Sequence, residues 1–154
     1  MDIKTLQNQP NIETDKKLQS AFERFSQLLD ELRKRKLPDT IVQEINRPIN
    51  QANAANENPK ASRKILKKQQ YAIIKLLEKE LKIVPKNYYR NTWIPLGMTT
   101  FGLPIGVALG TALGNIAFLG IGLPIGMAIG LAVRTEKDKK AAAEGRQLDL
   151  EYEL

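Results

Sequence analysis

The chain has 154 residues, a net charge of +7, and no histidine or cysteine. Without these two residue types it lacks the usual general base, a thiol nucleophile, disulfides and the commonest metal ligands. Since it also has no Gly-rich phosphate loop and no suitably placed pair of carboxylates, we expect neither an enzyme nor a protein that binds a metal or cofactor.

The N-terminal segment, residues 1–12, precedes the first helical pattern and is predicted to be disordered. It has no apolar core of the kind that a secretory leader needs. Over residues 1–90, Lys and Arg outnumber Asp and Glu by 19 to 11. We therefore expect residues 1–90 to stay in the cytoplasm, with residues 13–90 forming a basic region of about three helices.

A first helix is predicted from about Thr14, because apolar residues recur there at alternating steps of four and three. These residues are Leu18, Phe22, Phe25, Leu29 and Leu32. Thr14 or Asp15 can cap the start, and the basic run 33–36 and Pro38 mark the end. The seam favours packing against a later helix of the same chain, with a self-associating coiled coil as the alternative.

A second, weaker helix is predicted from Thr40, because residues 40–43 match a capping box. Its apolar face is formed by Ile41, Ile45 and Ile49. Pro48 is expected to bend or end this helix. The Asn-rich stretch from Asn50 to Pro59 has no periodicity and indicates a connector.

The third predicted helix, from about Lys60 to Val84, has an apolar face and a basic face on opposite sides. The basic residues that we expect to face lipid are Lys64, Lys67, Lys68 and Lys75. Such a face can be simply solvated, can approach anionic lipid head groups, or can bind the phosphates of nucleic acid. The lack of a recognisable nucleic-acid fold and the adjacent membrane segment argue against nucleic acid as a partner.

Residues 91–133 carry no charged side chain, and their flanks are typical of a membrane interface. The interface residues are Lys86, Tyr88, Tyr89, Arg90 and Trp93 at the start and Arg134 and Lys137 at the end. One spanning helix needs about 20 residues, so a stretch of roughly twice that length indicates a transmembrane hairpin of two helices. With a turn near Gly114 and Asn115, both termini would lie on the cytoplasmic side of the inner membrane.

Nine of the ten glycines lie in this stretch, many of them four residues apart. Those expected to pack helices together or to mediate oligomerisation are Gly102, Gly106, Gly110, Gly114, Gly122, Gly126 and Gly130. Four-residue spacing lines up bare backbone on one helical face, where a neighbouring helix can approach closely. A second track of small residues on another face consists of Ala108, Ala112, Ala128 and Ala132. One face can close the hairpin and the other can contact a second molecule, so we expect a homo-oligomer.

The segment from Gly102 to Gly110 is repeated from Gly122 to Gly130, and each copy contains a proline. Transmembrane helices tolerate a proline when neighbours satisfy the freed carbonyls. Alternatively, the helices begin at Leu103 and Leu123 with a turn at residues 120–122. The second helix would then be too short to span, and the hairpin would be re-entrant or packed in a soluble assembly.

A family resemblance rests on the spaced glycines and on three short sequences. These are the repeated Gly-Leu-Pro-Ile-Gly, Asp-Lys-Lys-Ala at 138–141 and Glu-Gly-Arg-Gln-Leu at 144–148. They resemble the small, largely uncharacterised bacterial membrane proteins grouped as glycine-zipper family proteins. The resemblance covers about residues 93–148 and implies helix packing rather than a particular activity. The broader class includes pore-formers and membrane-anchored scaffolds.

Residues 134–154 form a charged helix end and a tail in which apolar residues alternate with acidic or polar ones. The tail is expected to be disordered, or to be a short strand that docks on the sheet edge of a partner.

These elements predict an all-α protein in which a cytosolic region of about three helices precedes a Gly-rich transmembrane hairpin of two helices. We expect a non-enzymatic inner-membrane protein that oligomerises through a glycine zipper and anchors a helical scaffold or adaptor domain. The alternatives are a pore-forming or channel-like effector and a soluble helical interaction module with a Gly-rich packed hairpin. Expected partners are the lipid bilayer, further copies of the chain, and a protein that binds the cytosolic helices or the tail.

Overall fold

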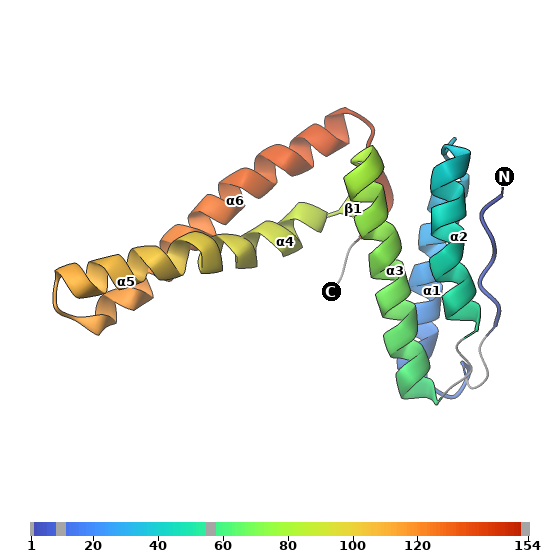
Figure 1. The fold of residues 1–154 in the computed structure, drawn as a ribbon, viewed down its shortest axis with the longest axis horizontal. Coiled ribbons are helices and arrows are strands. Elements are labelled where there is room, and N and C mark those ends of the chain that lie inside the picture. Colours follow the sequence, from blue (N-terminus) through green and yellow to red (C-terminus); the bar gives the residue numbers. More distant parts are fainter. Residues whose placement is uncertain (1, 9–11, 55–57, 152–154) are drawn as a thin grey trace. The chain divides into compact units, whose positions relative to one another are not determined.

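The structure, a computed structural model, describes residues 2–8, 12–54 and 58–151. The chain divides into two compact units, Met1–Ile83 and Val84–Leu154. The first unit contains three helices, and the second contains a long helical hairpin and a small two-stranded sheet (Figure 1). The predicted fold class, about three helices followed by a two-helix hairpin, is confirmed.

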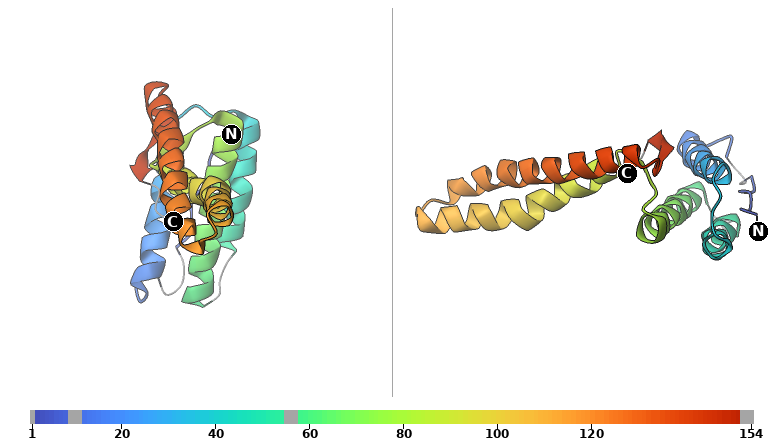
Figure 2. Two further views of the ribbon diagram at one scale, coloured as in Figure 1. Left: turned by 90° about the vertical axis from the view of Figure 1, so that its left-hand side faces the viewer. Right: turned by 90° about the horizontal axis from the view of Figure 1, so that it is seen from above.

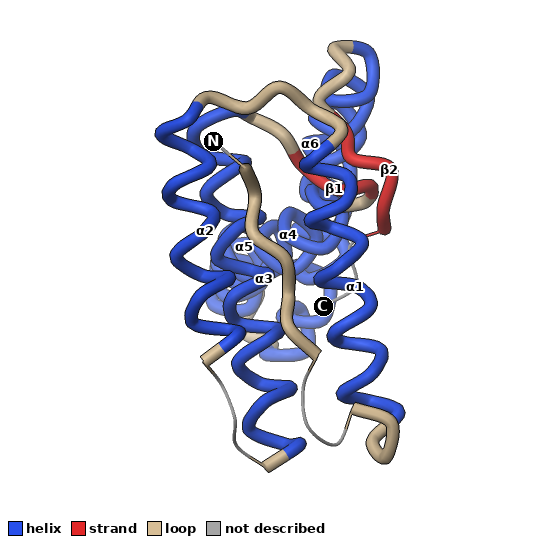
Figure 3. Tube along the Cα trace, turned by 90° about the vertical axis from the view of Figure 1, so that its right-hand side faces the viewer, coloured by secondary structure: helices blue, strands red, loops and turns tan. Residues whose placement is uncertain are grey.

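The first unit is built on helix α3, Pro59–Leu81, against which α1, Lys16–Arg33, and α2, Asp39–Asn53, both pack (Figure 3). Its fully buried side chains include Leu18, Phe25, Leu28, Leu29, Leu32, Ile45, Ile49, Leu66, Ile73, Ile74 and Leu77. The apolar seam of α1 is thus covered by the chain's own helices, as its spacing predicted.

Local chemistry explains how the helices of this unit begin and end. The Asp15 carboxylate accepts hydrogen bonds from the backbone N–H groups of Lys17 and Leu18, at 2.8 and 3.0 Å, and confirms the predicted cap of α1. Helix α3 ends at Lys82, whose left-handed backbone, φ 55°, allows the Ile83 N–H to bond back to the carbonyl of Leu77. Val84, expected in this helix, therefore lies in a strand.

Two expectations for α2 are wrong. The helix begins at Asp39 after Pro38 and has no side-chain cap, so the capping box predicted from Thr40 lies inside the first turn. The predicted connector from Asn50 begins too early, because Pro48, expected to bend or end the helix, does not end it and the helix continues to Asn53. The carbonyl that loses its hydrogen bond belongs to Glu44, an exposed residue, so water can satisfy it.

The second unit is a hairpin of two long helical arms. The first arm, Tyr88–Ala112, consists of α4, Tyr88–Gly97, a π-helical segment η1, Met98–Gly102, and α5, Leu103–Ala112. The second arm comprises the 3₁₀ turn η2, Ile116–Phe118, and α6, Leu119–Ala143. The arms lie side by side along their length, as the right view of Figure 2 shows.

The turn between the arms falls where the sequence predicts it. Gly114 has a positive φ of 64°, which glycine adopts without strain. The side chain of Asn115 then caps the second arm by accepting a hydrogen bond from the Ala117 N–H at 2.9 Å. The alternative turn at residues 120–122 is wrong, because these residues lie inside α6.

A parallel pair of strands closes the open end of the hairpin. Strand β1, Val84–Lys86, precedes the first arm, and strand β2, Gln147–Glu151, follows the second. The pairing aligns Val84 with Gln147 and Pro85 with Leu148. The tail was expected to be disordered or to dock on a partner; residues 147–151 instead pair within the chain, where Leu148 is fully buried.

Candidate membrane hairpin and its flanks

The contact between the two arms is made by glycine backbones. Gly97, Gly102 and Gly106 of the first arm and Gly122, Gly126 and Gly130 of the second are all buried. A Cβ atom added at Gly126 would lie 2.5 Å from the Gly102 nitrogen, and one at Gly106 would lie 2.9 Å from the Leu119 carbonyl oxygen. Real Cβ atoms do not approach backbone so closely. Any side chain at these positions would therefore push the arms apart.

The seven glycines predicted from their spacing do not all share this role. Gly102, Gly106, Gly122, Gly126 and Gly130 pack arm against arm. A Cβ at Gly110 would meet the Asn115 oxygen at 3.4 Å, which is ordinary contact, and Gly114 belongs to the turn. The predicted glycine face thus closes the hairpin within one chain.

The sequence analysis missed Gly97, which contacts Gly126 and Gly130. Gly97 precedes Gly102 by five residues and so falls outside the four-residue series. The π-helical segment η1 accommodates the extra residue in one wide turn, as the backbone bond from the Leu103 N–H to the Met98 carbonyl shows. Gly97 therefore lies on the same face of the first arm as Gly102 and Gly106.

The outer surface of the arms is apolar. Apart from Tyr71, all the large hydrophobic side chains recorded as exposed among the described residues lie on the hairpin. They are Leu96, Phe101, Leu103, Val107, Leu113, Ile116, Ile121, Ile125 and Met127. The alanine track, consisting of Ala108, Ala112, Ala128 and Ala132, is exposed as well. The hairpin therefore buries glycines between its arms and leaves nine large aliphatic or aromatic side chains exposed on its outside.

Aromatic and charged residues join the two arms near the open end. The Lys137 ammonium lies 5.3 Å from the ring centroids of both Tyr89 and Trp93. This geometry is that of a cation–π interaction between the arms. Tyr89 also packs edge-on against Tyr88, with ring centroids 5.3 Å apart. Of the predicted interface residues, the structure thus brings Tyr88, Tyr89, Trp93 and Lys137 together.

The other predicted interface residues lie around this cluster. Lys86 forms an ion pair with Asp149 across the two strands, Arg90 is exposed, and Arg134 is half-buried.

Thr99 and Thr111 of the first arm use their hydroxyls within their own helix. Thr99 donates to the Pro95 and Leu96 carbonyls at 3.0 and 3.1 Å. Thr111 donates likewise to the carbonyls of Val107 and Ala108, both at 3.0 Å. These bonds cover polar atoms that would otherwise face an apolar surrounding, and they leave less polar surface on the arm.

In the first unit, the four lysines of α3 that we expected to face lipid are all exposed: Lys64, Lys67, Lys68 and Lys75. The opposite face of α3 is buried through Leu66, Ile73 and Leu77. The predicted separation of a basic from an apolar face is therefore present. Among the described residues, no cluster of three acidic side chains is placed to hold a metal ion.

By length and composition, the two arms, Tyr88–Ala112 and Ile116–Ala143, could each cross a membrane. No protein-family model, curated protein or solved structure matches the chain. The geometry of the hairpin and the surface of the helical unit are therefore the features that bear on function.

Proposed function

We propose that the chain is a non-enzymatic bacterial inner-membrane protein whose hairpin spans the bilayer and anchors the helical unit as a scaffold or adaptor. One observation carries this proposal: glycines fill the contact between the arms while Leu, Ile, Val, Met and Phe side chains cover the outside. A soluble helix places its large apolar side chains in the core, whereas helices in lipid pack through small residues.

The extent of burial supports the same conclusion. Only 17% of the most apolar window of each arm is buried within this chain. The central helix of a soluble protein passes the same test of length and hydropathy but is mostly buried. An apolar surface this exposed has to be covered from outside the chain, and lipid is the simplest cover.

The orientation that we propose has both ends of the hairpin on the cytoplasmic side. The pairing of β1 with β2 supports it, because the strands that precede and follow the arms lie at one end of the hairpin. The cations Lys86, Arg90, Arg134 and Lys137 flank the arms at that end. Cytoplasmic loops are rich in Lys and Arg, so the turn at Gly114 would face the periplasm.

The basic face of α3 gives the helical unit a means to approach the membrane. Each Lys near an anionic surface contributes up to about 1 kcal/mol of attraction. A short connector separates α3 from the first arm, and four lysines project from one side of the helix. We propose that this face contacts anionic head groups while the rest of the unit binds a partner.

For assembly into oligomers, we propose the alanine track rather than the glycine face. The glycines are occupied by the opposite arm, whereas Ala108, Ala112, Ala128 and Ala132 are exposed. Small residues on an exposed face let a second hairpin approach closely in lipid. The pore alternative receives less support, because the hydroxyls of Thr99 and Thr111 bond to their own helix.

The test is whether the full-length protein stays in the membrane through a carbonate wash and needs detergent for release. Ile121→Arg combined with Ile125→Arg should abolish this retention, because each Arg at the centre of a span costs about 2.5–3.5 kcal/mol. The matched control, Thr135→Arg with Glu136→Arg, changes exposed residues beyond the uncharged stretch and should retain it. Release of the unaltered protein by carbonate would refute membrane insertion.

A further inference from the structure

Residues 2–8, called here the N-terminal strap, run as an extended segment between α1 and α2 (Figure 3). The side chain of Asn46 brackets the strap: its Nδ2 donates to the Asp2 carbonyl at 3.0 Å, and its Oδ1 accepts from the Lys4 N–H at 2.9 Å. Asn53 repeats the arrangement with the Thr5 carbonyl at 3.0 Å and the Gln7 N–H at 2.9 Å. Each amide thus binds the backbone of the strap as a neighbouring β-strand would.

The two amides are spaced to match an extended chain. They are seven residues apart on α2, which is about 10.5 Å along the helix at 1.5 Å per residue. The backbone groups that they bind repeat every three residues of the strap, which is about 10 Å of extended chain. A peptide in any other conformation would lose register with one of the two asparagines.

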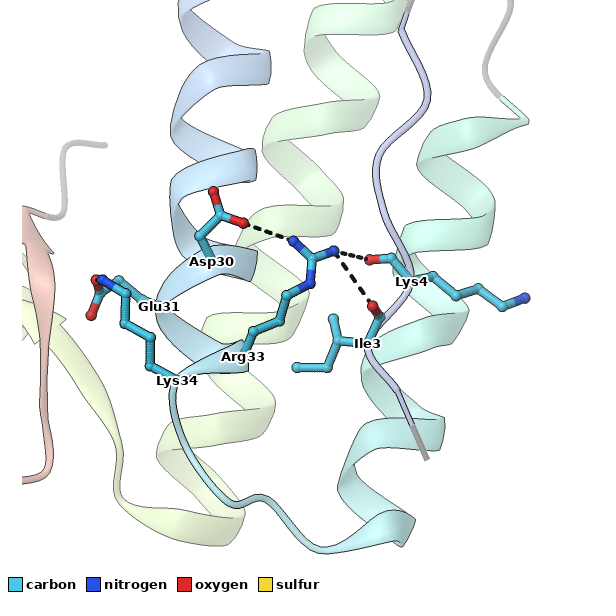
Figure 4. A network of polar contacts seen from close by, with 6 residues as sticks. All are labelled: Ile3, Lys4, Asp30, Glu31, Arg33 and Lys34. Carbon is cyan, nitrogen blue, oxygen red and sulfur yellow. Dashed lines mark hydrogen bonds and ion pairs between the residues drawn. The ribbon is translucent and has the colours of Figure 1, made fainter.

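Helix α1 contributes a third backbone contact on the other side of the strap. The Arg33 guanidinium donates to the Lys4 carbonyl at 2.9 Å and to the Ile3 carbonyl at 3.4 Å (Figure 4). Asp30 holds this guanidinium through a 2.7 Å ion pair. Arg33 and the two asparagines therefore recognise main-chain atoms and place no demand on the side chains of the strap.

Side-chain selectivity comes from two positions and from the charge of the groove. Ile3 and Leu6, three residues apart, are half-buried, whereas Lys4, Thr5 and Gln7 are exposed. A pocket of about 470 Å³ adjoins the start of the strap and is lined by Asp2 and Ile3 of the strap and, on the groove side, by charged residues that include Arg33, Arg35, Lys36 and Asp39. Three cations against one carboxylate on the groove side suit an acidic residue directly before the first aliphatic one.

The polar groups of the groove require an occupant. Asn46 is only 7% exposed, and both ends of its amide bond to the strap. If the strap left without replacement, a buried amide would lose its partners, which is more costly than losing an exposed hydrogen bond. A segment that offers the same backbone groups removes that cost.

From these contacts we propose that the groove between α1 and α2 is a binding site for an extended peptide segment of a partner protein. The segment carries an acidic residue, then an aliphatic one, then a second aliphatic residue three positions later. The strap is the resident occupant, and the partner's segment replaces it. The groove would thereby give the helical unit its adaptor surface, independently of whether the hairpin spans a membrane.

The test uses the full-length protein in mild detergent with Lys4→Pro, which removes the N–H that Asn46 accepts and weakens the strap. The probe is a fluorescent peptide with the sequence of residues 2–8. Its anisotropy should report saturable binding at least tenfold tighter to this variant than to the unaltered chain, whose strap occupies the groove. A chain that lacks residues 1–8 serves as a second opened form if the first does not fold.

Substitutions in the groove then test the assignment. In the opened chain, Asn46→Ala or Asn53→Ala should each weaken the peptide by about tenfold, because each removes two hydrogen bonds to the peptide backbone. Asn50→Ala is the matched control, since the Asn50 side chain contacts the described strap residues through a bond from the exposed Lys4 ammonium, at 2.9 Å, and not through the strap backbone, and it should change binding less than threefold. A probe N-methylated at Lys4 should bind more weakly than one N-methylated at Thr5.

Three results would overturn the proposal. The first is the absence of saturable binding to both opened chains, and the second is binding that is insensitive to Asn46→Ala combined with Asn53→Ala. The third is a dimer of the unaltered protein that Lys4→Pro abolishes, which would assign the groove to the strap of a second copy instead of a partner.

Discussion

One of the close glycine contacts between the arms makes a quantitative prediction for Gly126. A Cβ at this position would lie 2.5 Å from the Gly102 nitrogen, whereas ordinary contact begins at 3.4 Å, so the arms must separate locally by about 0.9 Å. A gap of 0.5–1 Å forfeits about a quarter to a half of the dispersion energy between the atoms concerned. Gly126→Ala should therefore loosen the arm contact, and Gly126→Leu should open it by more.

The separation can be measured with spin labels. Because the chain has no cysteine, single cysteines at Leu96 and Met127, both exposed, place one label on each arm. Gly126→Leu should widen and broaden the distance distribution between the labels in lipid nanodiscs. Gly120→Leu is the matched control, since a Cβ at Gly120 in the same helix meets nothing within 4 Å. Equal effects of the two substitutions would refute the glycine contact.

Three further predictions follow from the flanks, the turn and the basic helix. Single cysteines at Lys16 and Glu151 should be shielded from an impermeant thiol reagent in intact cells, whereas one at Ile116 should be labelled; labelling of only one terminus would refute the hairpin topology. Lys137→Gln should alter the emission of Trp93, the only tryptophan, and destabilise the open end by about 1 kcal/mol or less, while Lys139→Gln leaves the emission unchanged. Changing the exposed Lys64, Lys67, Lys68 and Lys75 of α3 to Gln in a 1–83 fragment should weaken its binding to anionic vesicles, and the same change at lysines 16, 17, 34 and 36 should do so less.

The elements that could be predicted from the sequence are those whose cause is local. The alternating apolar spacing of α1 predicts which face of the helix is apolar, and Asp15 predicts its cap, because both depend on neighbours within a few residues. The uncharged stretch predicts two helices by length alone, and the turn at Gly114 needs only a residue that tolerates positive φ. None of these depends on a contact far along the chain.

The features that were missed depend on partners distant in sequence or on a change of helical period. Gly97 joins the glycine face only because a π-helical turn absorbs one residue. The strap depends on amides more than forty residues away, at Asn46 and Asn53, although their seven-residue spacing on one face of α2 was a visible signal. Strand β2 forms by pairing with β1, which lies more than sixty residues earlier. The alternation of apolar and polar residues in the tail could indicate a β-strand, but it could not indicate with which strand it would pair.

The exposed surface of the hairpin bears on the choice between a membrane protein and a soluble one. A large apolar side chain that stays about half exposed forgoes roughly 1 kcal/mol of burial free energy. Nine such residues on one hairpin therefore forgo on the order of 10 kcal/mol, which is as large as the whole stability of an ordinary domain. The glycine contact cannot offset this loss of burial free energy, because glycines remove little apolar surface from water.

A soluble chain would have to cover both arms with further copies of itself, whereas a bilayer covers them without any further protein contact. A protein that stays in solution only in detergent, as one copy or as an oligomer, would therefore favour lipid as the native surrounding of the hairpin, and a detergent-free assembly of many copies would favour the soluble alternative.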